Sequence, residues 1–490
     1  MKAALLSTSR GCNPTSSKSS PFFSTLTNNT PLPAEFLAAL STLFGASDLY
    51  TAPEDCWAYG YDNSRRHSLP LAVVFATTHE QVQALVRACN HYGIALTARG
   101  RGTGTTGASV PVTGGIVVSL ERMDKLIEFS PENRYITVEA GMTNQCLQDI
   151  VQQHGFFWPP DPTSAAYCSV GGNLACNAAG PRAVKYGTPR ENTLGLWAVT
   201  GLGDDLRVGV YTSKGVVGYD LTRLLIGSEG TLAIITRATL KLTPLPEAKL
   251  TIRAIYRSVA DAALAVSAIM AQPVIPCALE FIDGNALNII RQNAPCELPN
   301  TAGALLMIEV DGLAAQVALA AEKVAASAQN DGLLDIRLAT SAAEVQALWQ
   351  IRKALAPALR KAAPHKINED VVVPVTAIPA LIAGLEQLSK QHQLPIINFG
   401  HAGNGNIHVN LLLDATIPGQ KDNAQRCLAA VFSLVLSLNG TLSGEHGVGL
   451  EKRDFIDWEL SANALALMRG IKRQFDPNGI LNPDKMFPLE

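Results

Sequence analysis

The sequence contains no run of 18 apolar residues, which excludes a conventional membrane-spanning helix. Its nine cysteines show no C-x-x-C spacing, and their odd number argues against a disulfide framework. We therefore expect reduced thiols in a cytosol-like compartment. Charged residues make up 17% of the chain and the net charge is −3, so nothing indicates affinity for nucleic acid or for an anionic membrane. These absences favour a small-molecule partner.

Acidic residues are missing from the N-terminal region as far as Glu35. This region is rich in Ser, Thr, Asn and Pro and carries Lys2, Arg10 and Lys18. Organellar transit segments and disordered extensions share this composition. We expect residues 1–46 to be a partly disordered extension of a cytoplasmic protein, with the organellar matrix as the alternative location.

The length of 490 residues and the hydrophobic content of 47% predict two or three domains with large cores. An α/β pattern begins near Pro70, with strands over 71–75, 116–120 and 135–140. A helix follows the first strand, opened by the capping-box pairs Thr77/Glu80 and Thr78/Gln81 and ended by Gly93. A second helix is expected from about Thr143.

Beyond Pro244 and Pro246, Ala- and Leu-rich helices alternate with short apolar segments. This pattern predicts a second α+β domain whose sheet is covered by helices. The expected strands are 251–256, 278–282, 305–310, 335–338, 371–375 and 396–399, and the last helix is expected near 462–475.

Residues 99–107, R-G-R-G-T-G-T-T-G, contain four glycines directly after the apolar run 94–98. Only glycine lets main-chain N–H groups converge on an anion without Cβ collisions, so the loop predicts a phosphate site. Gly102, Gly104 and Gly107 match the nicotinamide-binding G-x-G-x-x-G, but no helix follows them, as that fingerprint requires. An ordinary glycine-rich turn stays the alternative.

Residues 158–180 consist mostly of Gly, Ala, Ser, Asn and Pro and show neither helical nor strand periodicity. This composition indicates backbone wrapped around a large buried ligand. Cys168 and Cys176 within it are expected to be buried structural thiols.

The segment from His401 to His408, H-A-G-N-G-N-I-H, places two of nine histidines at the end of an apolar run. Positions seven apart face opposite ways on a regular strand, but the glycines between them allow both imidazoles to converge. Together with Glu445 they would form a two-histidine, one-carboxylate site for Zn²⁺, Mn²⁺ or Fe²⁺, leaving His446 as a base. The alternative is that the histidines only form hydrogen bonds in turns.

Two basic residues are candidates for binding a substrate carboxylate. Arg352 lies in the helical segment W-Q-I-R-K-A-L and Lys366 lies just before an apolar run. Solvated helix-face residues are the alternative interpretation.

Several separated motifs occur in a characteristic order: the glycine loop, P-D-P-T-S, S-V-G-G-N-L-A-C-N-A-A-G, Y-D-L-T-R-L-L-I-G-S-E-G-T-L and the two histidine segments. In these motifs the chain resembles the FAD-linked oxidase family, flavoproteins of the vanillyl-alcohol-oxidase type. It is most similar to the branch holding D-lactate dehydrogenase, the glycolate oxidase large subunit and D-2-hydroxyglutarate dehydrogenase. The resemblance implies an α+β fold with a two-part FAD-binding domain over 47–246 and a cap domain over 247–490, whose C-terminal segment returns to the flavin.

The resemblance also implies which residues contact FAD. Arg101 replaces a glycine that is usual in the family, so its side chain either points away from the phosphates or joins them as a cation. The first loop has no histidine or suitably placed cysteine, so we expect non-covalent FAD. The expected contacts are Gly100, Arg101, Gly102, Thr103, Gly104, Pro160, Asp161, Thr163, Ser164, Gly171, Gly172, Asn173, Asn177, Gly180, Ile235 and Asn482.

The activity implied by the resemblance is dehydrogenation of a D-2-hydroxy acid. A divalent metal, with Zn²⁺ as first choice, would lie on His401, His408 and Glu445, and His446 would take the hydroxyl proton. Asn404, Arg352 and Lys366 would bind the substrate. Ala356 replaces a threonine of hydroxyglutarate-type members, so D-lactate is the first choice, with glycolate and D-2-hydroxyglutarate as alternatives.

Electrons must leave for a partner, because the chain has no cysteine ligand set for an iron–sulfur cluster. A quinone, a cytochrome, an electron-transfer flavoprotein or another subunit would serve, and peripheral membrane attachment and a homodimer are compatible with this. One rival hypothesis is a flavin subunit of a glycolate-oxidase-like complex. The other is a metal-dependent hydrolase without flavin.

Overall fold

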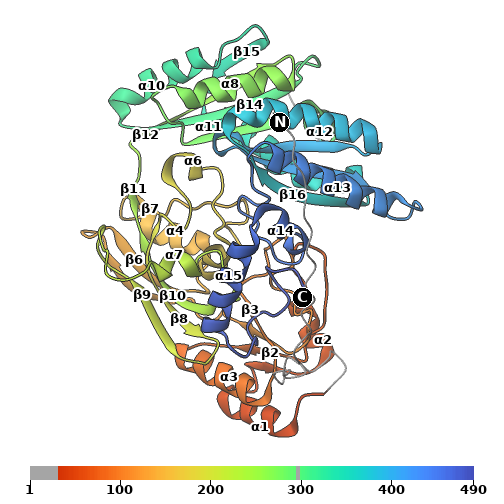
Figure 1. Ribbon diagram of the computed structural model, residues 1–490. Coiled ribbons are helices and arrows are strands. Elements are labelled where there is room, and N and C mark those ends of the chain that lie inside the picture. Colours follow the sequence, from red (N-terminus) through yellow and green to blue (C-terminus); the bar gives the residue numbers. More distant parts are fainter. Residues whose placement is uncertain (1–30, 294–297, 490) are drawn as a thin grey trace, which may run out of the picture.

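The computed structural model describes residues 31–293 and 298–489, and these form a lower part with two sheets and an upper cap with a third (Figure 1). Residues 1–30 of the expected extension 1–46 lie outside the described residues, and Ala34–Leu43 within it form a helix. The first sheet is mostly parallel, with Phe36 and Leu40 of the first helix packed against Leu85 of the third in its core. Its strand order is β1 (Leu49–Tyr50), β2 (Ala72–Phe75), β4 (Ile116–Ser119) and β3 (Leu96–Arg99), covered by α1 (Ala34–Leu43) and α3 (His79–Tyr92), with α2 (Pro53–Cys56) alongside.

The second sheet of the lower part is antiparallel and five-stranded. Its order is β5 (Leu126–Ser130), β6 (Tyr135–Glu139), β10 (Ala233–Lys241), β8 (Thr193–Thr200) and β9 (Asp205–Gly209). The helices in its core are α4 (Asn144–Gln152), α5 (Val170–Cys176) and α7 (Leu221–Leu225), joined by α15 (Ala462–Phe475) from the far end of the sequence. Between the parts lie α6 (Ala183–Tyr186) and the small ladder of β7 (Phe156–Phe157) with β11 (Thr243–Pro244).

The cap is built on a seven-stranded antiparallel sheet with helices on both faces, as the sequence predicts. The strand order is β15 (Leu333–Leu338), β12 (Ala248–Tyr256), β14 (Ala304–Gly312), β13 (Ala278–Asp283), β17 (Ile396–His401), β18 (Asn406–Leu413) and β16 (His365–Val372). One face packs on α8 (Val259–Ala271), α10 (Ala314–Ser327), α12 (Ile378–His392) and α13 (Gln420–Ser437), and the other on α9 (Gly284–Asn293) and α11 (Ala342–Ala362). The short α14 (Ile456–Glu459) precedes α15.

Capping residues and glycines in the sequence predicted several helix boundaries correctly. The Thr78 hydroxyl accepts a hydrogen bond from the Gln81 N–H at the start of α3, and Gly93 ends that helix with φ 65°. The last helix begins and ends at the expected residues, and residues 107–115 contain no helix, as expected.

Two predictions of local structure were wrong. Residues 158–180 contain a regular helix, α5, because the Ser169 hydroxyl caps it and Asn177 ends it with φ 53°. A short helix that is buried on several sides needs no alternation of apolar and polar residues at helical spacing. The sequence therefore shows no helical pattern here. The strand expected at 371–375 is β16, which begins six residues earlier at His365, and the strand β18 was not predicted at all.

The two parts of the molecule are joined by polar contacts. The Asp311 carboxylate on β14 accepts hydrogen bonds from the Lys185 ammonium and, at 2.8 Å, from the Tyr186 hydroxyl. Both residues belong to α6. Glu229 of the lower part accepts hydrogen bonds from the N–H groups of Val448 and Gly449. These contacts hold the cap directly over the lower part.

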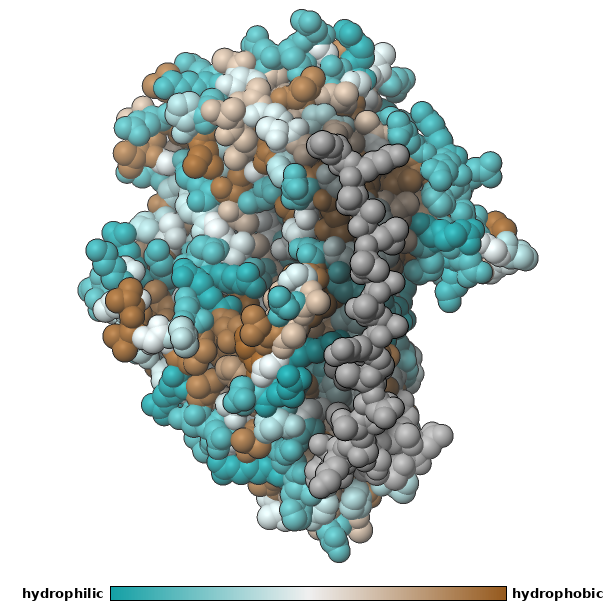
Figure 2. All heavy atoms as spheres, viewed as in Figure 1, coloured by the Kyte–Doolittle hydropathy of each residue, from teal (hydrophilic) through white to brown (hydrophobic). Residues whose placement is uncertain are grey.

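The surface is mainly hydrophilic, but hydrophobic residues gather in the area of α7 and α15 (Figure 2). Leu467 and Met468 of α15 are exposed there. Within the described residues, no helix combines the length and the apolar character that crossing a membrane requires.

Candidate active site

The two histidines of the sequence motif lie on a tight hairpin between β17 and β18. A single 3-10 turn (Ala402–Asn404) and Gly405, with φ 74°, reverse the chain. A side chain at Gly405 would overlap the carbonyl oxygen of Val373. The turn brings the rings of His401 and His408 to 5.3 Å between centroids, on one face of the sheet.

Glu445 completes the cluster from the loop after α13. Its Oε1 lies 3.2 Å from Nε2 of His401 and 3.7 Å from Nε2 of His408. Its other oxygen accepts a hydrogen bond of 2.7 Å from the Gly180 N–H, in the small-residue segment of the lower part. The ligand atoms of the three residues lie within 4.8 Å of one another, so this group could hold a metal ion.

A second carboxylate, Glu280 on β13, supports His401 from behind. It is hydrogen-bonded to Nδ1 of His401 and, at 2.7 Å, to Nε of Arg352 on α11. The Arg352 guanidinium also stacks over the Phe399 ring at 4.7 Å. Arg352 is therefore linked to the cluster through Glu280, and its expected contact with a substrate carboxylate stays a prediction.

Charges around the cluster shift its pKa values in different directions. Burial lowers the pKa of His401, but Glu280 and Glu445 outweigh it and raise that pKa to about 10. Burial and the charges of His446 and His401 lower the pKa of His408 well below its usual value. Burial raises the pKa of Glu445, yet the adjacent histidines bring it well below its usual range. These shifts favour the neutral, metal-binding form of His408 and the protonated form of His401, which must lose its proton to bind a metal.

His446 lies against this cluster, with its ring stacked on that of His408 at 5.2 Å and 14°. Its Nδ1 lies 3.5 Å from Oδ1 of Asp370 on β16. Asp370 is completely buried, as is Lys452, which donates a hydrogen bond of 2.6 Å to it. The expected base thus lies beside the cluster, and its role stays a prediction.

Lys366 is on β16, on the same face of the sheet as Asp370 but four residues away. Its Nζ lies 3.4 Å from the Asn410 side-chain oxygen. Burial, together with the charges of Arg360 and Arg65, lowers the pKa of Lys366 to about 8. An anionic partner beside this ammonium would favour its charged form.

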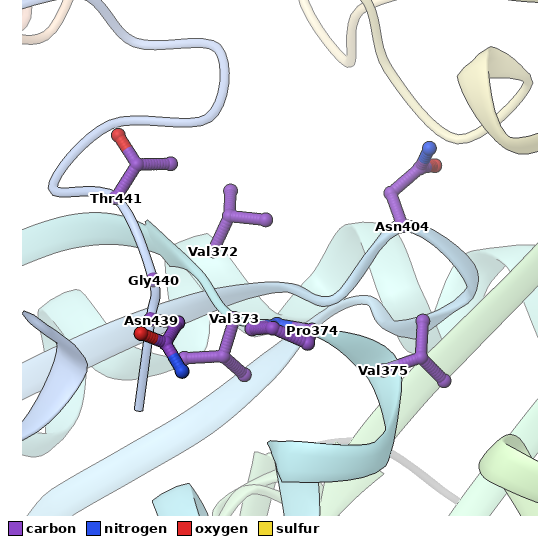
Figure 3. A pocket seen from close by; sticks show the side chains of 8 residues that line it. All are labelled: Val372, Val373, Pro374, Val375, Asn404, Asn439, Gly440 and Thr441. Carbon is purple, nitrogen blue, oxygen red and sulfur yellow. The ribbon is translucent and has the colours of Figure 1, made fainter. Parts of the chain in front are cut away.

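Asn404 is exposed, at the rim of a hollow of about 370 Å³ (Figure 3). The hollow is lined by residues 372–375, Asn404 and residues 439–441. Asn404 points to the same side as Val372 and Thr441. His401, His408, Glu445 and His446 do not line this hollow, so it is separate from the cluster.

The two expected FAD segments of the lower part lie side by side. Gly100 faces the Ser169 hydroxyl at the start of α5 so closely that a Cβ there would overlap it. Gly102 has φ 66°, in the left-handed region that glycine favours. The buried atoms Oγ1 of Thr105 and Nδ2 of Asn173 have no hydrogen-bond partner within the described residues. The loop, α5 and these polar atoms fit a bound dinucleotide.

Four other residues expected to contact FAD are Asp161, Ile235, Arg101 and Asn482. The Asp161 N–H donates to the Ala179 carbonyl oxygen, and its carboxylate lies 3.4 Å from Arg182. Ile235 is buried on β10, and the Arg101 side chain is exposed. Asn482 donates hydrogen bonds to the carbonyl oxygens of Ala108 and Glu229, so the C-terminal segment does return to the glycine loop.

Sequence reasoning missed Glu280 and Asp370. Glu280 is an acid inside an apolar strand, A-L-E-F-I, and because acids are rarely buried unless they are paired, this placement was a signal that could have found it. Asp370 follows Glu369 in the largely polar segment H-K-I-N-E-D-V-V, which gives no such signal.

Comparison with known proteins agrees with this geometry. Residues 70–209 match the profile of the FAD binding domain, and residues 245–486 match that of the C-terminal domain of FAD linked oxidases. The glycolate oxidase subunit GlcD of Bacillus subtilis (strain 168) is 36% identical over 430 residues, 88% of this chain and 92% of the relative. The chain belongs to the FAD-linked oxidase family.

Other members of the family are similarly close. D-2-hydroxyglutarate dehydrogenase of Xanthomonas citri pv. viticola is 35% identical, covering 92% of this chain and 96% of that protein. D-lactate dehydrogenase of Archaeoglobus fulgidus is 35% identical, covering 88% of this chain and 95% of that protein. The solved structure of p-cresol methylhydroxylase with substrate bound has a TM-score of 0.74 at 19% identity, covering 93% of this chain and 98% of that one. That likeness shows the shared fold of an FAD-binding domain and a cap.

Proposed function

We propose that this flavoprotein oxidises a D-2-hydroxy acid to the 2-oxo acid, with D-lactate as the preferred substrate. The observation that carries the proposal is the position of His446, whose ring stacks on His408 beside the His401, His408 and Glu445 cluster. The same Glu445 touches Gly180 of the expected flavin segment, which puts the cluster next to the dinucleotide region. The names of the relatives, which include a D-lactate and a D-2-hydroxyglutarate dehydrogenase, support this class of substrate.

His401, His408 and Glu445 would hold a divalent metal, with Zn²⁺ as first choice, and the glycine loop with α5 would hold FAD non-covalently. The metal would supply a Lewis acid for the substrate hydroxyl, and FAD would supply the hydride acceptor. His446 takes the hydroxyl proton on Nε2, because its Nδ1 side faces Asp370. Lys366 and Arg352 bind the substrate carboxylate, and Asn404 adds a hydrogen bond to the substrate.

The test is stopped-flow reduction of the flavin by D- and L-lactate, glycolate and D-2-hydroxyglutarate. We expect D-lactate to reduce the flavin fastest and L-lactate to leave it oxidised. Reduction by the five-carbon dicarboxylate alone would overturn the lactate assignment. A colourless protein that takes up no FAD would instead support the metal-dependent hydrolase.

A separate experiment concerns the electron acceptor. We expect the purified chain alone to reduce an artificial dye with D-lactate, since the cluster and the flavin segment lie in one polypeptide. A chain whose flavin is reduced by substrate but which passes no electrons to dye would favour a subunit of a glycolate-oxidase-like complex. A quinone, a cytochrome or an electron-transfer flavoprotein would then be tested with the partner subunits present.

Lys366 gives a prediction about pH. Its ammonium is present below its pKa of about 8 and is lost above it, so attraction for the substrate carboxylate fades as the pH rises. We expect KM for D-lactate to rise about tenfold per pH unit above pH 8, because only the protonated lysine binds the carboxylate. In Lys366→Arg, whose side chain stays charged, this rise should disappear. A KM that is flat from pH 7 to about pH 9.5 in the unmodified protein would contradict the role of Lys366.

A further inference from the structure

Asp370 accepts hydrogen bonds from three successive backbone N–H groups of the loop that carries Glu445 and His446. Its Oδ2 accepts hydrogen bonds from Gly444 at 2.8 Å, Glu445 at 2.5 Å and His446 at 3.1 Å. Its Oδ1 accepts from Lys452 at 2.6 Å and from the Ser443 hydroxyl at 3.3 Å. One buried carboxylate therefore fixes the whole turn from Ser443 to His446.

The same carboxylate also faces the side chain of His446. Oδ1 lies 3.5 Å from Nδ1, and no hydrogen bond to that nitrogen is formed within the described residues. Because the ring is stacked on His408, it has little freedom to rotate away from Asp370. A proton on Nδ1 is attracted to the carboxylate, which leaves the lone pair on Nε2, at the opposite edge of the ring.

We propose that Asp370 is the positioning residue of His446, holding its backbone in the turn and its ring in the tautomer with a free Nε2. This inference rests on the proposed function, in which His446 takes the substrate proton. In serine proteases, replacing the aspartate that orients the catalytic histidine by asparagine lowers kcat by about 10⁴-fold, because the amide stabilises the wrong tautomer of the histidine.

The alternative is that Asp370 only neutralises the buried Lys452. Lys452 has a second carboxylate within reach, since Oε2 of Glu369 lies 3.4 Å from its Nζ. Among the contacts of the described residues, Glu369 makes none with the turn from Ser443 to His446. Burial raises the pKa of Glu369 to about 7, against the opposing charge of Lys452. Glu369→Gln is therefore a matched control, which alters the charge beside the lysine and leaves the turn in place.

The experiment compares Asp370→Asn with Glu369→Gln in the FAD-loaded chain. We expect Asp370→Asn to slow flavin reduction by about 10²–10⁴-fold with flavin content unchanged, and Glu369→Gln to stay within about threefold of the unmodified protein. The decisive step is a double-mutant cycle with His446→Asn. If Asp370 acts through His446, adding Asp370→Asn to His446→Asn costs less than about threefold more when all variants are saturated with Zn²⁺.

A second readout does not depend on turnover. Because Asp370 also holds the backbone of Glu445, Asp370→Asn should weaken Zn²⁺ binding by about 10–100-fold in a chelator competition, while Glu369→Gln should not. If Asp370→Asn does not fold, Asp370→Glu keeps the charge beside Lys452 but displaces the oxygens. It should then be folded, yellow and about 10²-fold slower.

The outcomes separate this inference from the proposed function. Fast reduction by Asp370→Asn or Asp370→Glu, with the slow reduction of His446→Asn retained, would overturn only the role of Asp370. Fully additive losses in the cycle would also overturn it, since they would show a structural effect independent of His446. Wild-type reduction by His446→Asn alone would overturn the base itself, and the role of Asp370 with it.

Discussion

Replacing His446 by asparagine is expected to slow reduction of the flavin by about 10²–10⁴-fold while leaving FAD bound, the usual scale for loss of a general base. The ring lies beside the metal-binding cluster and stacks on His408, but its side chain contributes little to the core, being partly exposed. Asparagine keeps a polar group near the Nδ1 position, so the contact toward Asp370 is partly preserved. The chemical step should therefore suffer far more than folding.

The measurement is single-turnover stopped-flow reduction with saturating D-lactate, together with the flavin spectrum and the thermal unfolding midpoint. His392→Asn is the matched control, because His392 lies at the end of α12 and hydrogen-bonds Asn423 away from the cluster. It should reduce flavin at the unmodified rate. Equal rates for both variants would remove His446 from the mechanism, and loss of flavin from His446→Asn would show a structural role instead.

The parts of the site that are local in sequence could be predicted from it. His401 and His408 converge because Gly405 permits a left-handed turn within a single hairpin, and the glycines between the histidines already indicated this. The sequence indicated Glu445 as the third ligand only because it is a carboxylate between glycine-rich residues. It did not show that Glu445 lies near the histidines. The structure brings it there through Gly180, a contact between residues 265 positions apart.

The supporting carboxylates could not be placed because their partners depend on strand order. Asp370 lies opposite His408 because β16 pairs with β18, and the bridge between Val372 and Thr441 brings the turn at Glu445 to it. Glu280 meets His401 because β13 pairs with β17, although more than a hundred residues separate them. Alternating helices and strands predict that a covered sheet exists, but do not predict which strands are neighbours. The helix α5 was missed for a different reason, since burial on several sides removes the amphipathic period.

The metal ligands give the second prediction with a large effect. Glu445→Gln keeps a side-chain oxygen that can accept the hydrogen bond from Gly180, but it loses the negative charge between His401 and His408. A neutral amide is a much poorer ligand for a divalent cation than a carboxylate. We expect metal content to fall to near zero after dialysis and flavin reduction to slow by about 10³-fold, which corresponds to about 4 kcal/mol of lost transition-state stabilisation.

Glu459→Gln is the control for this experiment, because Glu459 also accepts a backbone hydrogen bond, from Leu442 at 2.9 Å, outside the cluster. It should retain the metal and the rate. Chelation of the unmodified protein should reproduce the loss seen in Glu445→Gln, and added Zn²⁺ should restore activity to the chelated protein but not to the variant. If Glu445→Gln kept both metal and rate, the carboxylate would serve only to join the cap to the lower part through Gly180. His401 and His408 would then hold the metal without this carboxylate.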